Sequence, residues 1–566
     1  MKIEMVQDNA VVGDIAGNLS KALMWLEHTH SDLLVFPECF LTGYPLQDLV
    51  VRPGFLASVD EAMDRLAVAV RSKGSCGVLM GAPLAGTNLP YNAAHLIRPD
   101  GSRQVALKTE LPNNDVFDER RTFARNMNPL PLTFMGHSLG VMVCEDMWHG
   151  KVARALADEG AEILIVLNGS PMENLKQDVR LGHARRRVRD TGLPLLYLNL
   201  VGGQDELVFD GASFVLNAQG ELVAQRPFDS GSIVVECGLN FAPTCLGHKN
   251  APSEHTDNSG VIAYPEEMEA IYQTLVVGLR DYVHKNGFKR TLLGLSGGLD
   301  SALVAAIAVD ALGPEGLLAL MLPAQWTGAE SKDLATDMAQ RLQCAYKSVP
   351  VGAITNALEN ILDGALDGFE APTSARNLAS ENFQARARGN LLMGVSNALP
   401  GTLLLSTGNK SEMSVGYATL YGDMCGGFNP IKDLYKTRVF ALCAWRNANQ
   451  LPWMKGPSNP IPERIITRPP TAELAEGQTD EGKLGSYPML DAVLECLVER
   501  LLDAEAAARE ASKMCGQAVD VEYTNRIAQL VKLAEYKRRQ APPGIKVTAR
   551  SFGFGWRYPI TNKAKL

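Results

Sequence analysis

A glycine-rich stretch carries the strongest chemical signal in the sequence, reading G-L-S-G-G-L-D-S from position 294 to position 301. The basic and apolar stretch 289–293 before it predicts a buried strand, and the apolar run 302–309 after it predicts a helix packed on all sides. Backbone N–H groups at such a turn, together with the dipole of the helix that follows, favour an anion. The stretch consists of Gly294, Leu295, Ser296, Gly297, Gly298, Leu299, Asp300 and Ser301.

The residue types in this stretch indicate phosphate. Gly297 and Gly298 let the backbone approach a phosphate closely, and the two serines can donate hydroxyl hydrogens. The Asp300 carboxylate would repel a phosphate, so we predict that it holds a divalent cation bridging phosphates. The alternative is an ordinary strand-to-helix turn in which glycine only provides tightness. The sequence contains no G-x-x-x-x-G-K-[ST], which excludes a Walker A loop.

The S-G-G-L-D-S stretch resembles the loop of the ATP-pyrophosphatase family. The resemblance implies that the loop binds ATP by its β,γ-pyrophosphate while an oxygen nucleophile attacks the α-phosphorus. The expected chemistry is adenylation with release of pyrophosphate, rather than phosphoryl transfer.

Composition limits the class of protein. The 566 residues predict two or three domains, and 46% hydrophobic with 21% charged residues is typical of soluble proteins. The net charge of −9 argues against a nucleic-acid partner, and no apolar run is long enough to span a membrane. Ten scattered cysteines without a C-x-x-C pair, and the absence of a signal-peptide pattern, predict a reducing cytoplasm.

The first part of the chain predicts an α/β domain with two packed sheets, residues 1–240. A polar, irregular stretch at 241–261 predicts a linker, with an ordered surface strap as the alternative. Residues 262–566 predict a doubly wound parallel sheet. The strands that we expect lie at 33–37, 77–81, 139–143, 163–167, 195–200, 316–321 and 402–406, with hairpin turns at 99–101 and 217–220.

Glu38, Lys108 and Cys144 each follow or flank a predicted strand of the first domain. A carboxylate, an ammonium and a thiol that converge at strand ends could transfer an acyl group. The carboxylate would take the thiol proton, the thiolate would attack a carbonyl, and the ammonium would lower the thiol pKa and stabilise the oxyanion. Taken singly, a buried cysteine is usually a small apolar residue and a lysine usually lies on the surface.

The segments F-P-E, K-T-E-L-P-N and V-C-E-D-M-W around these three residues resemble the catalytic segments of the nitrilase superfamily, in the same order. The resemblance implies an αββα sandwich with Glu38 as base, Lys108 as oxyanion support and Cys144 as nucleophile. Stretches 116–123 and 168–171 resemble glutaminase domains, which implies glutamine as substrate, with contacts from position 114, Ser170 and Lys176. This sequence departs from the family at Asn114, where an aromatic Tyr is common.

The second half contains further polar segments at 381–388, 406–412, 416–423, 427–436 and 537–548. Thr407 follows a predicted strand and could bind ATP, and Glu412 could complete a Mg²⁺ site with Asp300. Together the segments resemble the synthetase domain of the glutamine-dependent NAD⁺ synthetases, over residues 262–566. The resemblance implies that deamido-NAD⁺ is bound by Asn382, Glu412, Asp423 and Lys537.

The same resemblance implies that ATP converts deamido-NAD⁺ into an adenylate, and that ammonia from glutamine displaces AMP to form NAD⁺. It also implies small-molecule substrates only, an ammonia tunnel and a homo-oligomer, commonly an octamer.

Two other functions remain open at this point. One is another ammonia-using ATP pyrophosphatase, such as a GMP or asparagine synthetase, although segments 428–436 and 537–548 favour NAD⁺ synthesis. The other is an inactive fusion that binds adenine nucleotides as a sensor, against which the intact Glu38, Lys108, Cys144, Ser296 and Asp300 argue.

Overall fold

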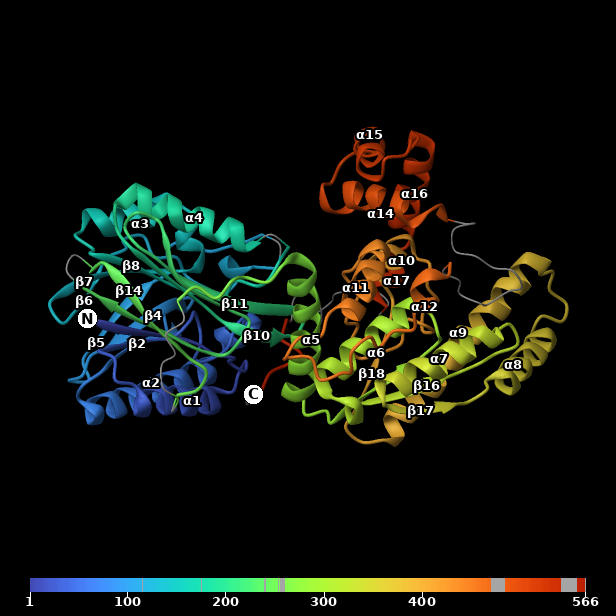
Figure 1. The fold of residues 1–566 in the computed structure, drawn as a ribbon, viewed down its shortest axis with the longest axis horizontal. Helices are drawn as coiled ribbons and strands as arrows, with labels where there is room; N and C mark the ends of the chain where they lie inside the picture. The colour runs from blue at the N-terminus through green and yellow to red at the C-terminus, as the bar shows by residue number, and fades with distance from the viewer. Residues whose placement is uncertain are drawn as a thin grey trace. The chain divides into compact units, whose positions relative to one another are not determined.

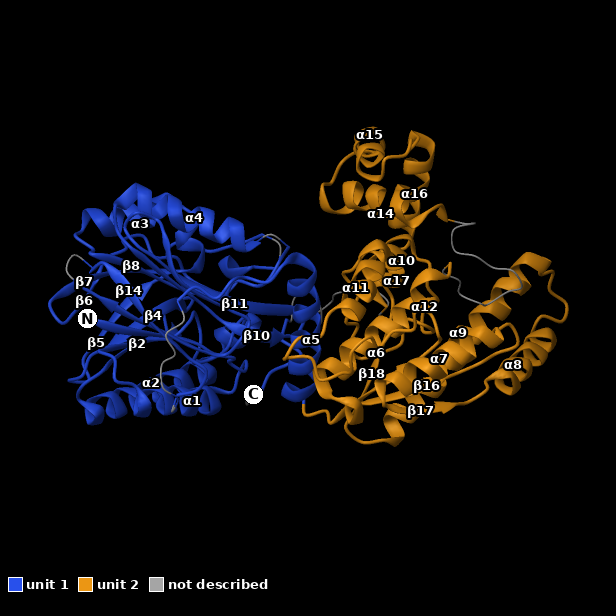
Figure 2. Ribbon diagram, in the orientation of Figure 1, with its two compact units in different colours: residues 1–286, 546–566 blue, residues 287–545 orange. Residues whose placement is uncertain are grey.

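The computed structural model describes residues 1–114, 116–174, 176–238, 241–252, 254, 260–469, 484–540 and 557–564. It contains two compact units, one of residues 1–286 with 546–566 and one of residues 287–545 (Figures 1 and 2). These limits differ from the predicted domains 1–240 and 262–566. No helix among the described residues is long and apolar enough to cross a membrane.

Two mixed sheets form the centre of unit 1 (Figure 1). The first has the strand order β14-β13-β1-β2-β3-β4-β5 and the second the order β10-β11-β9-β8-β7-β6, with β12 paired to β11. The strands of the first sheet are β1 (Lys2–Gln7), β2 (Leu33–Val35), β3 (Gly77–Leu84), β4 (Tyr91–Ile97), β5 (Arg103–Leu107), β13 (Gly231–Cys237) and β14 (Pro243–Lys249). Those of the second are β6 (Leu132–Phe134), β7 (His137–Val143), β8 (Ile163–Asn168), β9 (Leu195–Asn199), β10 (Val201–Gln204), β11 (Leu207–Leu216) and β12 (Leu222–Pro227).

Three apolar layers hold these sheets and their helices together. Alternation along β2 places Leu33 and Val35 between the sheets, while Leu34 faces the layer under α1 (Ile15–His28) and α2 (Pro53–Lys73). On the other sheet, α3 (Gly150–Asp158) and α4 (Lys176–Thr191) cover a third layer. The predicted αββα sandwich is confirmed.

The chain around the predicted linker is anchored to unit 1. Residues 243–249 form β14, which pairs antiparallel with β13. Helix α5 (Glu267–Lys285) is fastened through Asp281, whose Oδ2 accepts from Asn9 Nδ2 and from the backbone N–H of Gly203, both at 2.7 Å. These contacts explain why the limit between the compact units falls after residue 286 rather than at the predicted 261.

The C-terminal segment 557–564 also packs on unit 1, although residues 287–545 of unit 2 separate it in sequence from the rest of that unit. Gln204 Nε2 donates to the carbonyl of Thr561 at 2.7 Å, and the backbone N–H of Arg557 donates to Asp48 Oδ2 at 2.8 Å. Sequence patterns assigned this segment to the synthetase domain, because polar surface contacts of this kind leave no periodic signal.

Unit 2 contains a parallel sheet with the order β17-β16-β15-β18. Helices α6 and α9 both contact β15, and α9 covers the face that carries Leu292 and Leu320, so the predicted parallel sheet with packed helices is confirmed. The strands are β15 (Arg290–Gly294), β16 (Leu317–Met321), β17 (Ala345–Ser348) and β18 (Thr402–Leu405). The helices are α6 (Leu299–Leu312), α7 (Ala329–Leu342), α8 (Gly352–Ala365), α9 (Thr373–Ala398), α10 (Lys410–Val415), α11 (Lys436–Ala448), α12 (Glu463–Thr467), α14 (Tyr487–Leu494), α15 (Ala504–Cys515), α16 (Val521–Leu533) and α17 (Glu535–Arg539).

Two ion pairs join α6 to α11. Asp300 pairs with Lys436 at the start of both helices, and Asp310 pairs with Arg446 further along both. In the second pair, Arg446 Nε lies 2.6 Å from Asp310 Oδ2 and Nη2 lies 3.0 Å from Oδ1, with both side chains fully buried. The Arg446 pair therefore sets the register in which Asp300 and Lys436 meet.

We expect Arg446→Met to lower the unfolding free energy of unit 2 by about 3–5 kcal/mol, because it leaves the Asp310 carboxylate buried without its cation. The exposed pair Arg341–Asp337 supplies the control, and Arg341→Met should cost less than about 1 kcal/mol. Chemical unfolding of both variants measures the difference. Equal effects would show that the buried pair does not stabilise the α6–α11 packing.

Candidate active sites

The first site lies among fully buried charges in unit 1. Lys108 Nζ lies 2.7 Å from Glu38 Oε1, and neither side chain is exposed to solvent. Glu38 follows β2 and Lys108 follows β5, so both stand beyond the ends of strands in one sheet. Two further donors hold Glu38, Asn92 Nδ2 to Oε1 and the backbone N–H of Gly169 to Oε2, both at 2.7 Å.

A second carboxylate, that of Glu119, pairs with Lys108. Glu119 lies in the stretch 116–123, and its position in the sequence predicts no role for it. Its Oε2 lies 2.8 Å from Lys108 Nζ, and its Oε1 accepts from Tyr44 Oη at 2.9 Å and from Asn92 Nδ2 at 3.2 Å. Burial alone would lower the pKa of Lys108, but the carboxylates of Glu119 and Glu38 raise it well above its usual value. The two carboxylates therefore favour the charged ammonium form of Lys108.

Cys144 begins the turn that follows β7 and adopts a left-handed backbone conformation with φ 47°. Such a conformation is strained for a residue with a side chain and often marks a functional position. The Asp146 carboxylate ties this turn to the Lys108 segment, because Oδ2 accepts from the N–H of Val143 at 3.0 Å and Oδ1 from the N–H groups of Thr109 and Glu110 at 3.0 and 2.7 Å.

Burial, and then the charge of Glu38, raise the pKa of the Cys144 thiol well above its usual value. The Lys108 ammonium acts in the opposite direction, as expected, but it is outweighed. The predicted effect of the ammonium on the thiol is therefore confirmed in its direction, while burial and Glu38 leave the pKa of the thiol raised overall. The thiol keeps its proton until a base removes it, and Glu38 is the carboxylate held beside it.

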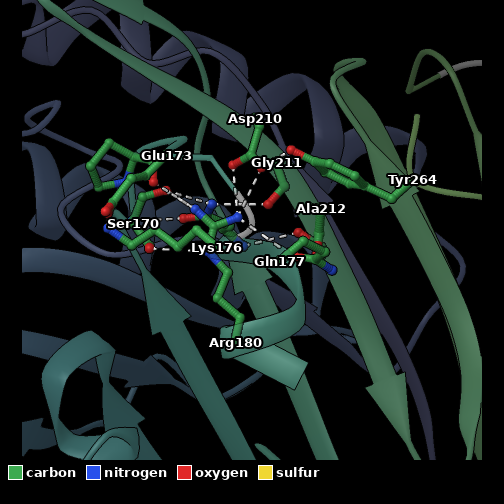
Figure 3. A network of polar contacts seen from close by, with 12 residues as sticks. Ser170, Glu173, Lys176, Gln177, Arg180, Asp210, Gly211, Ala212 and Tyr264 are labelled. Atoms are coloured by element: carbon green, nitrogen blue, oxygen red, sulfur yellow. Dashed lines mark hydrogen bonds and ion pairs between the residues drawn. The ribbon is translucent and has the colours of Figure 1, made fainter. Parts of the chain in front are cut away.

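The three predicted glutamine contacts lie in different surroundings. Ser170 is buried beside Arg180, and Lys176 opens α4 with its Nζ 3.0 Å from Glu173 Oε2 (Figure 3). Asn114 is exposed, and its carbonyl accepts from the N–H of Phe117 at 3.0 Å. Phe117 stacks on Tyr44 with ring centroids 6.2 Å apart, so an aromatic wall stands near the position where the family pattern departs.

The glycine-rich stretch connects β15 to α6 in unit 2. Gly297 has φ 77°, and a Cβ there would lie 2.2 Å from the carbonyl oxygen of Ser331, so only glycine fits. The hydroxyls of Ser296 and Ser301 lie 3.0 Å apart, and Ser301 Oγ donates to the carbonyl of Gly298 at 3.0 Å. The loop therefore stands at the carboxyl end of a central strand, where open α/β sheets bind ligands.

A lysine between two carboxylates lies beside this loop. Lys436 Nζ pairs with Asp300 Oδ2 and lies 3.2 Å from Glu412 Oε1, while Asn409 Nδ2 donates to Asp300 Oδ1 at 2.9 Å. Burial would lower the pKa of Lys436, but Asp300 and Glu412 raise it above its usual range. Lys436 lies in the polar segment 427–436, but its position there predicts no role of its own.

The two carboxylates fit the predicted Mg²⁺ site in part, because they already gather around one positive charge. Among the residues that the structure describes, no group of three or more His, Cys, Asp and Glu side chains is arranged to hold a metal ion. Phosphate oxygens and water would have to complete the coordination of Mg²⁺.

Three of the four residues predicted to bind the dinucleotide lie around the segment 416–423. Asn382 Oδ1 accepts from Thr419 Oγ1 at 3.0 Å, and Asp423 Oδ1 accepts from the N–H of Thr419 at 2.8 Å. Lys537 Nζ donates to the carbonyls of Gly416 and Ala418, both at 2.7 Å. Glu412 lies instead with Asp300 and Lys436, and Thr407 follows β18. Residues 541–548 of the last quoted segment lie outside the described residues.

Burial raises the pKa of Asp423 to about 6 and lowers the pKa of Lys537. Two ionisable groups whose pKa values are shifted by burial in this way are typical of a functional site.

Comparison with known proteins agrees with this division into two sites. A family model described as carbon-nitrogen hydrolase matches residues 2–242, and one described as NAD synthase matches residues 271–541. A glutamine-dependent NAD(+) synthetase of Rhodobacter capsulatus is 43% identical, covering 99% of this chain and 98% of that protein. The chain belongs to the glutamine-dependent NAD⁺ synthetases.

Two further relatives in this family extend the agreement. The synthetase of Thermotoga maritima is 38% identical and covers 100% of this chain and 99% of that protein. The solved structure of the Acinetobacter baumannii glutamine-dependent NAD⁺ synthetase, in complex with adenosine diphosphate, has a TM-score of 0.77 at 35% identity. It covers 100% of this chain and 99% of that chain. The predicted family is confirmed, and a GMP or asparagine synthetase is not the function of this chain.

We expect Glu119→Gln to reduce glutamine-supported NAD⁺ formation roughly 10- to 100-fold, because a small displacement of a reacting group costs that much. Without the Glu119 carboxylate, the Lys108 ammonium would shift toward Glu38, away from the position at which it is now held between the two. Synthesis from ammonium salt should not change. Glu162→Gln, at an exposed pair with His137, is the control and should leave both rates unchanged. A Glu119→Gln enzyme with wild-type use of glutamine would contradict a role for this carboxylate.

Proposed function

We propose that the two units divide the reaction of this family between them. The reaction is the ATP-dependent amidation of deamido-NAD⁺ to NAD⁺ with nitrogen from glutamine. Unit 1 releases ammonia from glutamine, and unit 2 activates the dinucleotide. One observation carries the proposal for unit 1, namely the buried Lys108 ammonium held between Glu38 and Glu119 within the electrostatic reach of Cys144.

In this proposal Glu38 removes the proton of the Cys144 thiol, and the thiolate attacks the side-chain carbonyl of glutamine. The raised pKa of the thiol supports this order, because the nucleophile is formed only when the base acts. Lys108 stabilises the oxyanion that forms. Glu38 then returns its proton to the departing nitrogen, ammonia leaves, and water hydrolyses the thioester to glutamate.

Glutamine would be bound next to these groups by Ser170 and Lys176. The exposed position of Asn114 supports only a marginal contact from that residue, and the Tyr44–Phe117 pair is the nearer apolar surface.

In unit 2 the glycine-rich loop would bind the phosphates of ATP through Ser296, Ser301 and its backbone N–H groups, with Thr407 as a further contact. Mg²⁺ would be held by Asp300 and Glu412 and would neutralise the charge of the departing pyrophosphate. Lys436, which now pairs with both carboxylates, would turn its ammonium toward the phosphates.

Deamido-NAD⁺ would lie against Asn382, Asp423 and Lys537, with its carboxylate directed to the α-phosphorus of ATP. The products of this step are an adenylate and pyrophosphate, and ammonia then displaces AMP.

We further propose a cytoplasmic homo-oligomer that takes only small-molecule substrates. The reducing compartment is supported by the cysteines, all ten of which are free thiols. Sedimentation of the purified enzyme would measure the number of subunits.

Cys144→Ala should abolish glutamine-supported NAD⁺ formation, by roughly 10³-fold or more, because the nucleophile is lost. Synthesis from ammonium salt should continue, since the synthetase site is in another unit. Measuring NAD⁺ from both nitrogen sources checks this. Loss of both activities in a folded variant would contradict the assignment of Cys144 to glutamine hydrolysis alone.

Asp300→Ala should abolish NAD⁺ formation from either nitrogen source while leaving glutamate release measurable. The variant would lose one of the two carboxylates that face Lys436 and the proposed Mg²⁺. Asp333→Ala, on the exposed face of α7, is the control and should behave like the wild type. Near wild-type synthesis by Asp300→Ala in ammonium would show that the loop does not act as proposed. If the chain were an inactive sensor, neither the wild type nor either variant would form NAD⁺.

A further inference from the structure

We propose that the buried Arg180–Asp210 ion pair is a positioning device for the turn Asn168–Pro171, and through it for Glu38. This inference rests on the proposed role of Glu38 and Cys144 in glutamine hydrolysis. Arg180 belongs to α4, a helix whose many arginines would otherwise indicate only a solvated basic face.

The guanidinium of Arg180 is fully buried and uses its donors on two different targets (Figure 3). Its Nη1 lies 2.9 Å from both carboxylate oxygens of Asp210. Its Nη2 donates to the backbone carbonyls of Ser170 and Pro171 at 2.9 and 2.8 Å, and its Nε donates to Ser170 Oγ at 3.2 Å. One planar group thus binds two successive carbonyls of the turn.

The same turn contacts the catalytic site. The N–H of Gly169 donates to Glu38 Oε2 at 2.7 Å. A Cβ at Gly169 would lie 2.8 Å from the Tyr44 ring and 3.2 Å from Glu38 Oε2, so the backbone is pressed against these side chains. On its other side, Asn199 Nδ2 donates to the carbonyl of Ser170 at 2.9 Å. A shift of the turn would therefore move the donor that fixes Glu38.

The cost of burying this pair supports a positioning role. The free-energy cost of removing two charges from water offsets most of their mutual attraction. Apolar residues of similar volume often stabilise a core equally well. An apolar side chain, however, could not hold two backbone carbonyls at fixed distances. Lysine could not either, because its single nitrogen lacks the planar fork of the guanidinium.

Asp210 is held in turn by a residue that lies just before α5. Tyr264 Oη donates to Asp210 Oδ2 at 2.8 Å (Figure 3). The backbone before Tyr264 is fixed to β12, since Ile262 and Gln225 exchange hydrogen bonds of 3.0 Å. Gln177 Nε2 of α4 in turn donates to Gln225 Oε1 at 3.0 Å. The position of the turn is thus set from both α4 and the segment that leads into α5.

The test compares Arg180→Lys with the wild type in the full-length enzyme. Lysine keeps a positive charge against Asp210 but loses the contacts with the turn. We expect kcat/KM for glutamine to fall roughly 10- to 100-fold, while NAD⁺ formation from ammonium salt stays unchanged. The matched control is Lys249→Gln, which breaks the buried pair of Lys249 with Glu4 in the same unit, 3.0 Å long, and should leave kcat/KM for glutamine unchanged.

Tyr264→Phe provides a second variant that removes one hydrogen bond and no charge, and it decides the matter if Arg180→Lys does not fold. We expect its kcat/KM for glutamine to fall roughly 2- to 10-fold. An unchanged value in the folded variants, or a loss equal to that of Lys249→Gln, would overturn the inference. Cys144→Ala is measured beside them, and if it still used glutamine, the proposed function of unit 1 would fail instead.

Discussion

The first site depends on one buried ammonium with a carboxylate on each side. Lys108 pairs with Glu38 and Glu119 at 2.7 and 2.8 Å, and water reaches none of the three appreciably. Removing these charges from water is costly unless each is paired and hydrogen-bonded, as they are here through Asn92, Tyr44 and Gly169. The surrounding strands, turns and aromatic rings are thereby held in one arrangement, and the Cys144 thiol is buried within the electrostatic influence of these charges.

Unit 2 also holds an ammonium between two carboxylates, but there the carboxylates are partly exposed to solvent. Lys436 is again an ammonium between two carboxylates, but Asp300 and Glu412 each keep 18% of the side chain exposed, whereas Glu38 keeps none. In the proposed reaction, a closed site would protect a thioester and a small neutral product, while an open one would admit two nucleotides and a cation. The Asp310–Arg446 pair further along the same helices lets this partly open site keep its geometry.

Strands and their end positions were predictable from the sequence because buried parallel strands are continuous apolar runs. The runs before Glu38 and Cys144 and the glycine-rich stretch were found in this way, and the structure has strands and α6 there. No comparable pattern marks Glu119 or Lys436, because a single charged residue in a loop or at the start of a helix predicts only a surface position. Arg180 could not be predicted for the opposite reason, because it lies in a helix so rich in arginine that the buried Arg180 and Arg187 cannot be distinguished from the exposed arginines. Strand β14, α5 and the segment 557–564 join unit 1 through contacts between residues far apart in sequence, which periodicity does not report.

The surroundings of Glu38 show why a backbone turn has to be placed so carefully. A carboxylate offers about four lone-pair positions. Lys108 and Asn92 both address Oε1, and the N–H of Gly169 takes one position on Oε2. In the proposed mechanism the remaining position on Oε2 would accept the proton of Cys144, and the Gly169 hydrogen bond would set its direction. A base with both oxygens saturated would be inert, and one without the Gly169 donor could rotate about its last bond. The hydrogen bond from the turn therefore leaves one acceptor position free on Glu38 Oε2 and determines the direction in which that position points.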